Sequence, residues 1–120
     1  MSDQPNEARP RTINWDDFTR VDIRIGTIVS AEEFPEARAP AFKLTVDFGP
    51  LGTRRSSAQI TKHYTAAELI GRQVACVVNF PVKRIAGFPS EILVLGGVPA
   101  GGDVVLLHPE RPVPDGTVVA

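Results

Sequence analysis

Cations and aromatic residues stand close together in one stretch of the chain's second half. Lys83 and Arg84 follow Phe80 and precede Ile85 and Phe88. Positive charge beside aromatic rings suits an RNA phosphate together with a stacked base. The same residues suit an extended peptide, because the apolar side chains can line a slot while the cations hold acidic groups. The alternative to a ligand site is a solvent-exposed loop with one phenylalanine packed against the protein.

Polar side chains also interrupt two apolar segments. Ser57 and Gln59 alternate with residues of apolar character, and Asn79 lies near the end of the apolar run from Val74 to Phe80. Hydroxyl and amide groups carry both a donor and an acceptor, so they can read base edges or peptide backbone. The alternative, that these groups form hydrogen bonds within the fold, stays open at this point.

Patterns typical of catalysis or metal binding are missing from the sequence. His63 and His108 have no cysteine or carboxylate partner at metal-ligand spacing. The single cysteine, Cys76, cannot form an internal disulfide, and its apolar neighbours disfavour a reactive thiolate. The glycine pairs near residue 100 lack the lysine and the spacing of a phosphate-binding loop. The sequence therefore predicts a binding protein with no enzymatic activity, no cofactor and no metal.

The charge distribution narrows the class of binding protein. The chain has 120 residues, which fits one domain, and its net charge of −1 argues against a generally basic nucleic-acid coat protein. Between residues 54 and 90, however, six bases stand against the single acid Glu68, which gives a local charge of +5. No apolar stretch has the length of a membrane span or a signal-peptide core, so we expect a cytoplasmic protein without membrane insertion.

Turn residues and apolar periodicity predict the elements that position these side chains. Residues 1–12 are expected to form a flexible leader. A single helical turn capped by Asn14 follows, and then a long strand over residues 21–34 in which Gly26 indicates a bulge or bend. Residues 43–48 alternate without error, with Leu44, Val46 and Phe48 expected in the core. A third strand is predicted over residues 54–60, with Ser56, Ala58 and Ile60 on one face.

The second half of the chain completes a barrel pattern. Thr65-Ala66-Ala67-Glu68 is a capping box that predicts a short helix, which ends at Gly71. Residues 73–80 and 91–95 are two further strands, joined by a loop over residues 81–89. Three strands, a short helix and two strands follow the order of an OB-fold. We therefore predict an all-β protein, a five-stranded OB-fold barrel with short helices and N- and C-terminal extensions.

A short apolar strand over residues 104–107 and a proline-rich tail over residues 109–116 fall outside these five strands. A small monomer has little surface left on which to bury them, so the sequence predicts a homodimer.

Several blocks in fixed order resemble the tRNA-binding domain family, found in methionyl-tRNA synthetases, in phenylalanyl-tRNA synthetase β subunits and as free-standing homodimers. The blocks cover residues 56–64, 68–74, 77–81 and 83–91. Within that family, residues 32–38, 56–62, 84–88 and 93–97 are most similar to the CsaA secretion chaperone group. The likeness runs from about Asp17 to Thr117, and it identifies residues 13–120 as one tRNA-binding-domain-like OB-fold with a C-terminal extension.

The resemblance implies a homodimer that suppresses aggregation and assists export of unfolded polypeptides or preproteins, with tRNA as an inherited ligand. With the residues discussed above, it gives a candidate peptide- or RNA-binding set: Ser57, Gln59, Lys62, Asn79, Phe80, Lys83, Arg84, Ile85, Phe88, Ser90 and Glu91. Two departures favour polypeptide over tRNA. Ala58 and Gln59 stand where tRNA-binding members usually have a Ser-Gly-Ile run, and Glu91 replaces a small residue with a charge that weakens phosphate binding.

Overall fold

The computed structural model describes residues 11–120. Most of the expected leader, residues 1–10, lies outside the described residues. The helices are α1 (Trp15–Thr19) and α2 (Ala66–Leu69), with a 3₁₀ turn at Gly49–Leu51. The strands are β1 (Ile23–Glu33), β2 (Phe42–Asp47), β3 (Thr53–Ala58), β4 (Gln73–Val77), β5 (Lys83–Ile85), β6 (Phe88–Ser90), β7 (Leu93–Val94), β8 (Gly96–Gly97), β9 (Val105–Leu106) and β10 (Val118–Val119).

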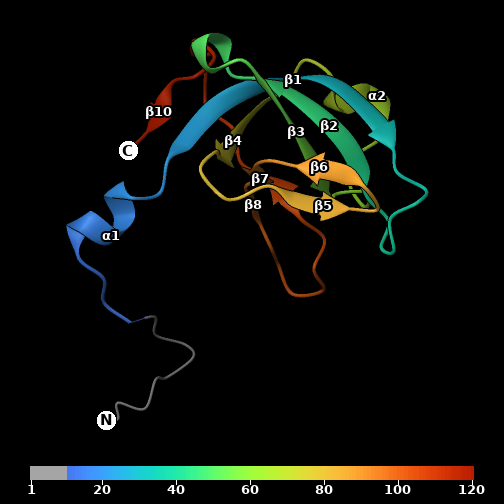
Figure 1. Cartoon of the computed structure of the whole chain (residues 1–120), viewed down its shortest axis with the longest axis horizontal. Helices are drawn as coiled ribbons and strands as arrows, with labels where there is room; N and C mark the ends of the chain where they lie inside the picture. The colour runs from blue at the N-terminus through green and yellow to red at the C-terminus, as the bar shows by residue number, and fades with distance from the viewer. Residues whose placement is uncertain (1–10) are drawn as a thin grey trace.

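The main sheet is antiparallel in the order β3-β2-β1-β4-β7, and β10 adds to β1. The long strand β1 curves over the molecule and pairs with β2, β4 and β10 (Figure 1). The sheet closes on itself where the Glu91 N–H donates to the Arg55 carbonyl at 2.8 Å. The Ser56 hydroxyl donates to the Ile92 carbonyl across the same seam, at 3.3 Å. The prediction of an all-β, OB-like barrel is confirmed.

The core fills the barrel from all five strands and from α2. Leu44, Val46 and Phe48 are buried, as the alternation in residues 43–48 predicted. Ser56, Ala58 and Ile60 also share a buried face, which confirms the predicted facing of β3. None of the helices in residues 11–120 is long and apolar enough to cross a membrane.

Gly26 has a different role from the predicted bulge. The register shift in β1 lies at Val29, between Ile28 and Ser30. A Cβ atom at Gly26 would lie 2.7 Å from the Phe48 ring and from a Val46 methyl group. Only glycine fits at this position, because core side chains pack directly against the strand backbone. The irregularity in the strand lies at Val29 instead.

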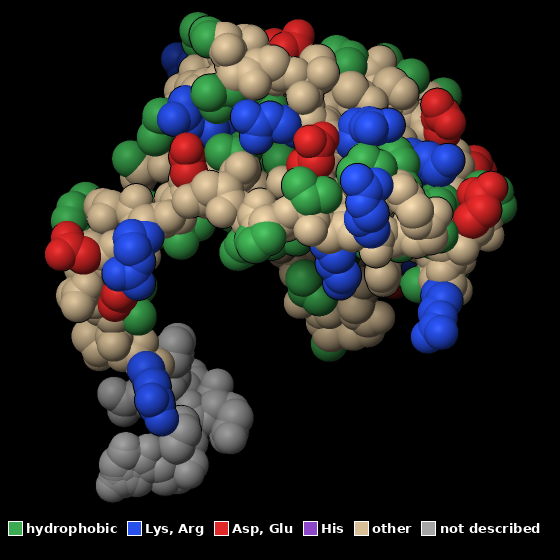
Figure 2. Space-filling view, viewed as in Figure 1, with side chains coloured by type: hydrophobic (Ala, Val, Ile, Leu, Met, Phe, Trp, Pro, Cys, Tyr) green, Lys and Arg blue, Asp and Glu red, His purple; other side chains and the backbone are tan. Residues whose placement is uncertain are grey.

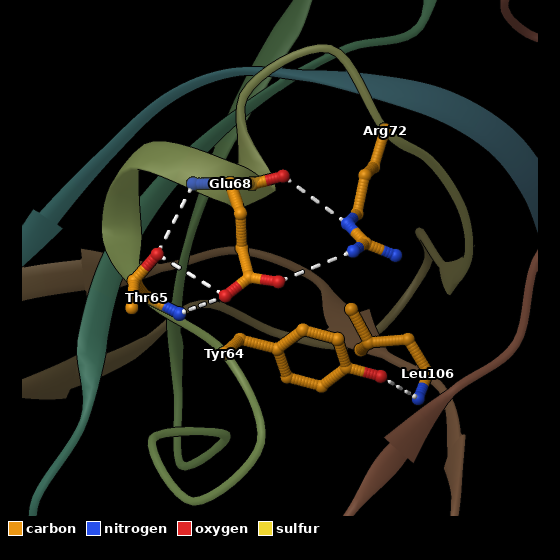
Figure 3. Close-up of polar contacts among 5 residues, drawn as sticks. All are labelled: Tyr64, Thr65, Glu68, Arg72 and Leu106. Carbon is orange, nitrogen blue, oxygen red and sulfur yellow. Dashed lines mark hydrogen bonds and ion pairs between the residues drawn. The ribbon is translucent and has the colours of Figure 1, made fainter.

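Both predicted helix starts are present, and the second is tied to the C-terminal part of the chain (Figure 3). In α2 the Glu68 N–H donates to the Thr65 hydroxyl, and the Thr65 N–H donates to the Glu68 carboxylate. That backbone bond comes first among the interactions that hold the pKa of the Glu68 carboxyl below its usual value. The Arg72 guanidinium lies 5.3 Å from the centre of the Tyr64 ring, and the Tyr64 hydroxyl accepts from the Leu106 N–H.

Two segments differ from the sequence-based expectation. Residues 81–89 form no open loop but the hairpin β5–β6, whose turn residues Ala86 and Gly87 have positive φ values of 48° and 82°. A two-residue turn with this backbone matches the right-handed twist of paired strands, which the sequence pattern Ala-Gly signals only weakly.

The C-terminal tail, the second of these segments, packs back onto the barrel. Gln73 donates to the Val113 carbonyl at 2.7 Å, Thr27 donates to the Asp115 carboxylate at 2.6 Å, and the Gly116 N–H donates to the Ile25 carbonyl at 2.7 Å. Leu106 is itself buried in the core. The premise that one protomer leaves this whole segment uncovered is therefore wrong, although Val105 and Leu107 remain about half exposed.

The capping box of α2 gives the first testable prediction. Replacing Thr65 by Ala removes the side-chain acceptor for the Glu68 N–H and should lower the free energy of unfolding by about 1 kcal/mol. Thr65→Ser keeps the acceptor and should cost much less. Urea unfolding followed by circular dichroism measures both; equal stability of the Ala and Ser variants would contradict this assignment.

Cys76 gives the second prediction. Burial raises the pKa of its thiol from 9.0 to about 12, because the thiolate would lose its hydration in the core. A thiol reagent such as dithionitrobenzoate should therefore leave the native protein unlabelled at pH 8 and react rapidly in urea. Since only the unfolded thiol ionises near pH 9, this group's contribution to stability should fall as the pH rises above that value. Rapid labelling without urea would show that the site is open.

Candidate functional site

An open groove of about 800 Å³ lies between the end of β3, the hairpin β5–β6 and strands β7 and β8. Most of its lining is apolar, and it includes side chains that a core would normally bury. Phe80 is 54% exposed at the groove, and Val82 and Leu93 are exposed to a similar degree. The apolar lining residues are Ala58, Ile60, Phe80, Pro81, Val82, Ile85, Ile92, Leu93, Val94, Leu95, Val98 and Val104.

Seven of the eleven residues that the sequence nominated line this groove. They come from three separate segments of the chain, which barrel closure brings together. They are Ser57, Gln59, Phe80, Lys83, Ile85, Ser90 and Glu91. The groove therefore unites apolar surface with hydroxyl, amide and charged groups, which is the composition of a ligand site.

Two of these polar side chains also close the barrel. The Ser90 hydroxyl accepts from the Ser57 N–H at 3.0 Å, and the Glu91 carboxylate accepts from the Arg55 N–H at 2.8 Å. Each of these side-chain oxygens accepts from a β3 N–H in the place of a backbone carbonyl of a neighbouring strand. Ser90 and Glu91 are thus structural residues as well as groove residues.

The other four nominated residues lie outside the groove lining. Asn79 accepts from the Asp22 N–H at 3.0 Å and donates to the Arg20 carbonyl at 2.8 Å, so its amide connects β4 to the segment after α1. For Asn79, hydrogen bonding within the fold is what the structure shows. Arg84 donates to the Gly87 carbonyl of its own hairpin turn, and Lys62 is exposed in the turn after β3.

Phe88, the fourth, belongs to a cluster that the sequence analysis missed. Its ring packs edge-on against Phe34, with 5.5 Å between ring centres. The Lys43 ammonium lies 5.0 Å from the centre of the Phe34 ring and 5.6 Å from that of Phe88, and the Arg55 guanidinium lies 5.4 Å from Phe88. We call these four residues the cation–aromatic cluster. Alternation in β2 could have indicated that Lys43 faces outward, but its contacts are too distant in sequence to infer.

The cations of this region have no acidic partners among residues 11–120. The ion pairs there are Arg20–Asp17, Arg24–Asp22, Arg72–Glu68 and Arg111–Glu110. Lys43, Arg55 and Lys83 are in none of them. Figure 2 shows Lys and Arg side chains spread among hydrophobic ones, with a few Asp and Glu side chains between them, over the face that carries the strands and the hairpin. The surface beside the groove therefore carries cations that form no ion pair within residues 11–120, although the net charge of the whole chain is −1.

Comparisons with known proteins agree with this picture. The family model of the tRNA-binding domain matches residues 23–118. The CsaA chaperone of Bacillus anthracis superposes with a TM-score of 0.88 at 58% identity, covering 92% of this chain and 100% of that one. The CsaA chaperone of Picrophilus torridus superposes with a TM-score of 0.84 at 45% identity, covering 91% of this chain and 100% of that one.

Longer proteins contain a similar segment. The methionine–tRNA ligase of Methanococcoides burtonii is 40% identical over 107 residues, which is 89% of this chain and 16% of the ligase. This chain therefore spans about a sixth of the ligase's length. The family match over most of the barrel, and the full-length similarity to two CsaA chaperones, lead to one conclusion: this chain belongs to the CsaA group of the tRNA-binding domain family.

Proposed function

We propose that this protein is a molecular chaperone that binds unfolded polypeptides or preproteins in the groove and assists their export. The observation that carries the proposal is the open apolar groove with Phe80, Val82 and Leu93 exposed along it. Apolar surface that a folded domain leaves open in one place marks a binding site for an apolar partner. Unfolded chains expose such side chains, whereas most folded proteins bury them.

The chemistry of the groove fits transient binding of many sequences. Burial of apolar area contributes about 25 cal/mol per Å² without requiring a fixed geometry. The polar side chains Ser57 and Gln59 lie at the same groove and can bond to peptide backbone, which every polypeptide offers. The similarity to two proteins described as chaperones, each along its whole length, supports this assignment.

A second candidate function, structure-specific tRNA binding, is favoured by the cation–aromatic cluster. OB-folds bind oligonucleotides on the face of their second and third strands, between the loops that flank it. Lys43 lies in β2 and Arg55 in β3, while Phe34 follows β1 and Phe88 lies in β6 of the hairpin. The family match to the tRNA-binding domain and the similarity to methionine–tRNA ligases support this alternative.

We also propose that the protein functions as a homodimer in which α1 packs on a second copy. No residue of α1 is buried, and Trp15 is 71% exposed beside the exposed Ile13. The helix projects away from the barrel (Figure 1). Val105 and Leu107 form a second half-exposed apolar area. A two-fold contact that covers either area would remove apolar surface from water in both protomers at once.

Charge reversal in the hairpin separates the two ligand classes. Each phosphate contact adds about 0.7 to the salt slope of single-stranded nucleic acid binding. The double change Lys83→Glu and Arg84→Glu should therefore weaken tRNA binding steeply and lower its salt dependence. Binding of an unfolded polypeptide that is held by apolar burial should fall much less. Fluorescence anisotropy with labelled tRNA and with labelled, reduced and carboxymethylated lactalbumin at two salt concentrations measures both.

The matched variant is Phe80→Ala, which removes an exposed ring and leaves the charges in place. It should weaken polypeptide binding by about 1–3 kcal/mol if the ring is an anchor in the complex, and it should affect tRNA little. Circular dichroism checks that both variants are folded. Loss of polypeptide binding in the charge-reversed variant with tRNA spared, or no effect of Phe80→Ala on either ligand, would contradict the proposed function.

The dimer proposal is tested by sedimentation velocity at micromolar concentration. The full chain should sediment as a dimer, and Trp15→Glu or Leu107→Glu should shift it toward the monomer. Ile70→Glu, at an exposed apolar residue after α2, is the control and should leave the dimer intact. Point changes are preferable to removing residues 104–120, because Leu106 is part of the core. A monomeric full-length protein would overturn the proposal.

A further inference from the structure

Strand β5 leaves one edge open beside the groove. Within residues 11–120 it pairs with β6 alone, in a sheet of two strands. The register places Lys83 opposite Ser90, Arg84 opposite Pro89 and Ile85 opposite Phe88. An open strand edge presents unpaired backbone donors and acceptors to any chain that can approach it.

Pro89 determines which backbone groups point to that open edge. In an antiparallel pair, residues alternate between those that exchange two hydrogen bonds and those that exchange none. Proline has no N–H to give, so Arg84 and Pro89 must be a pair that exchanges none. The two-residue turn at Ala86 and Gly87 requires the same register. The N–H and C=O of Arg84 therefore both point away from β6, toward the open edge.

The face of β5 next to this edge is a wall of the groove. Lys83 and Ile85 line the groove, whereas Arg84, between them, does not. Successive side chains of a strand point to opposite faces. A third strand placed beside β5 would therefore direct every second side chain toward the apolar groove and the others toward solvent.

Charge complementarity narrows the partner further. Lys83 forms no ion pair with a carboxylate among residues 11–120. The one carboxylate that lines the groove, that of Glu91, already accepts a hydrogen bond from the Arg55 N–H. An acidic side chain on the incoming chain would thus find an unpaired ammonium group at the groove.

We propose that an extended polypeptide binds by adding a strand to the free edge of β5 at Arg84, with alternate apolar side chains in the groove and an acidic one beside Lys83. The proposal rests on the proposed polypeptide-binding function and states how that binding is achieved. Backbone pairing makes the site tolerant of sequence, while the groove selects apolar residues at every second position. A helix satisfies its own backbone groups and gains nothing from this edge.

A scan of backbone methylation tests the mode with the unaltered protein. The probe is a fluorescein-labelled nine-residue peptide of alternating valine and serine with one aspartate, methylated at one backbone nitrogen at a time. One hydrogen bond contributes about fivefold in affinity, and the methyl group also blocks close approach. We expect a loss of fivefold or more at the position whose N–H pairs with the Arg84 carbonyl, and less than twofold at the positions on either side of it.

A pair of protein variants tests the same edge from the other side. Arg84→Pro removes the N–H that faces the open edge and the side-chain bond to the Gly87 carbonyl, but no backbone bond of the hairpin, and strands tolerate proline at such a position. Arg84→Ala removes the same charged side chain and keeps the N–H. We expect at least a fivefold loss of peptide affinity for the proline variant relative to the alanine variant. Circular dichroism and hydrogen exchange report whether the hairpin is intact.

A methylation scan without a position-specific loss, or equal affinities of folded Arg84→Pro and Arg84→Ala, would overturn the added strand. Lys83 and Arg84 would then be charged residues that discourage pairing at this edge. If the proline variant does not fold, the methylation scan decides alone. Failure of the proposed function has a different signature: the unmethylated peptide and unfolded lactalbumin would both fail to bind the wild-type protein, or Phe80→Ala would leave binding unchanged. A loss confined to the position that pairs with Arg84, together with a Phe80 effect, supports both.

Discussion

The seam between β3 and residues 90–92 is the contact on which the rest of the structure depends. Strand β3 pairs with β2 along one edge, and its other edge must find partners because unpaired backbone groups in a closed barrel cost several kcal/mol. Glu91 and Ser90 meet this need with one backbone bond and two side-chain bonds. The Ser56 hydroxyl, buried in the core, adds a fourth bond to the Ile92 carbonyl. The same seam fixes the hairpin over the barrel and so creates one wall of the groove.

Local chemistry determined the parts of the fold that could be predicted. The alternation of Leu44, Val46 and Phe48, the helix cap at Asn14 and the capping box at Thr65 act within a few residues, and the structure has them where the pattern placed them. The hairpin was missed because Pro89 normally argues against a strand. It is tolerated here at a position where a strand needs no N–H. Gly26 was misread because the cause of its small size lies some twenty residues away, in β2 and Phe48.

The residues of the candidate site also fall into those that could be predicted from local sequence and those that could not. Residues near the hairpin could be nominated because cations, aromatics and polar side chains lie close together in sequence. Leu93, Val98 and Val104 were not, since nothing local distinguishes an apolar residue in a groove from one in a core. Asn79 is a case in which the sequence left two alternatives open. An amide that ends a strand is equally suited to a ligand or to the backbone of a neighbouring segment, and only the fold shows that Arg20 and Asp22 occupy it.

The hairpin β5–β6 contributes residues both to the groove, proposed to bind polypeptide, and to the cation–aromatic cluster, which favours tRNA as the alternative ligand. Lys83, Ile85 and Ser90 face the groove, while Phe88, near the tip, is held against Phe34 and beneath the charges of Lys43 and Arg55. Binding by apolar burial in the groove depends little on salt. The attraction of exposed cations for a charged ligand is screened by salt, with a Debye length of about 10 Å at 0.1 M. At physiological ionic strength a ligand bound in the groove would therefore keep most of its affinity, and the cations would contribute mainly to steering and to selection of acidic partners. That balance is the physical reason for proposing polypeptide ahead of RNA as the ligand of a chain whose net charge is −1.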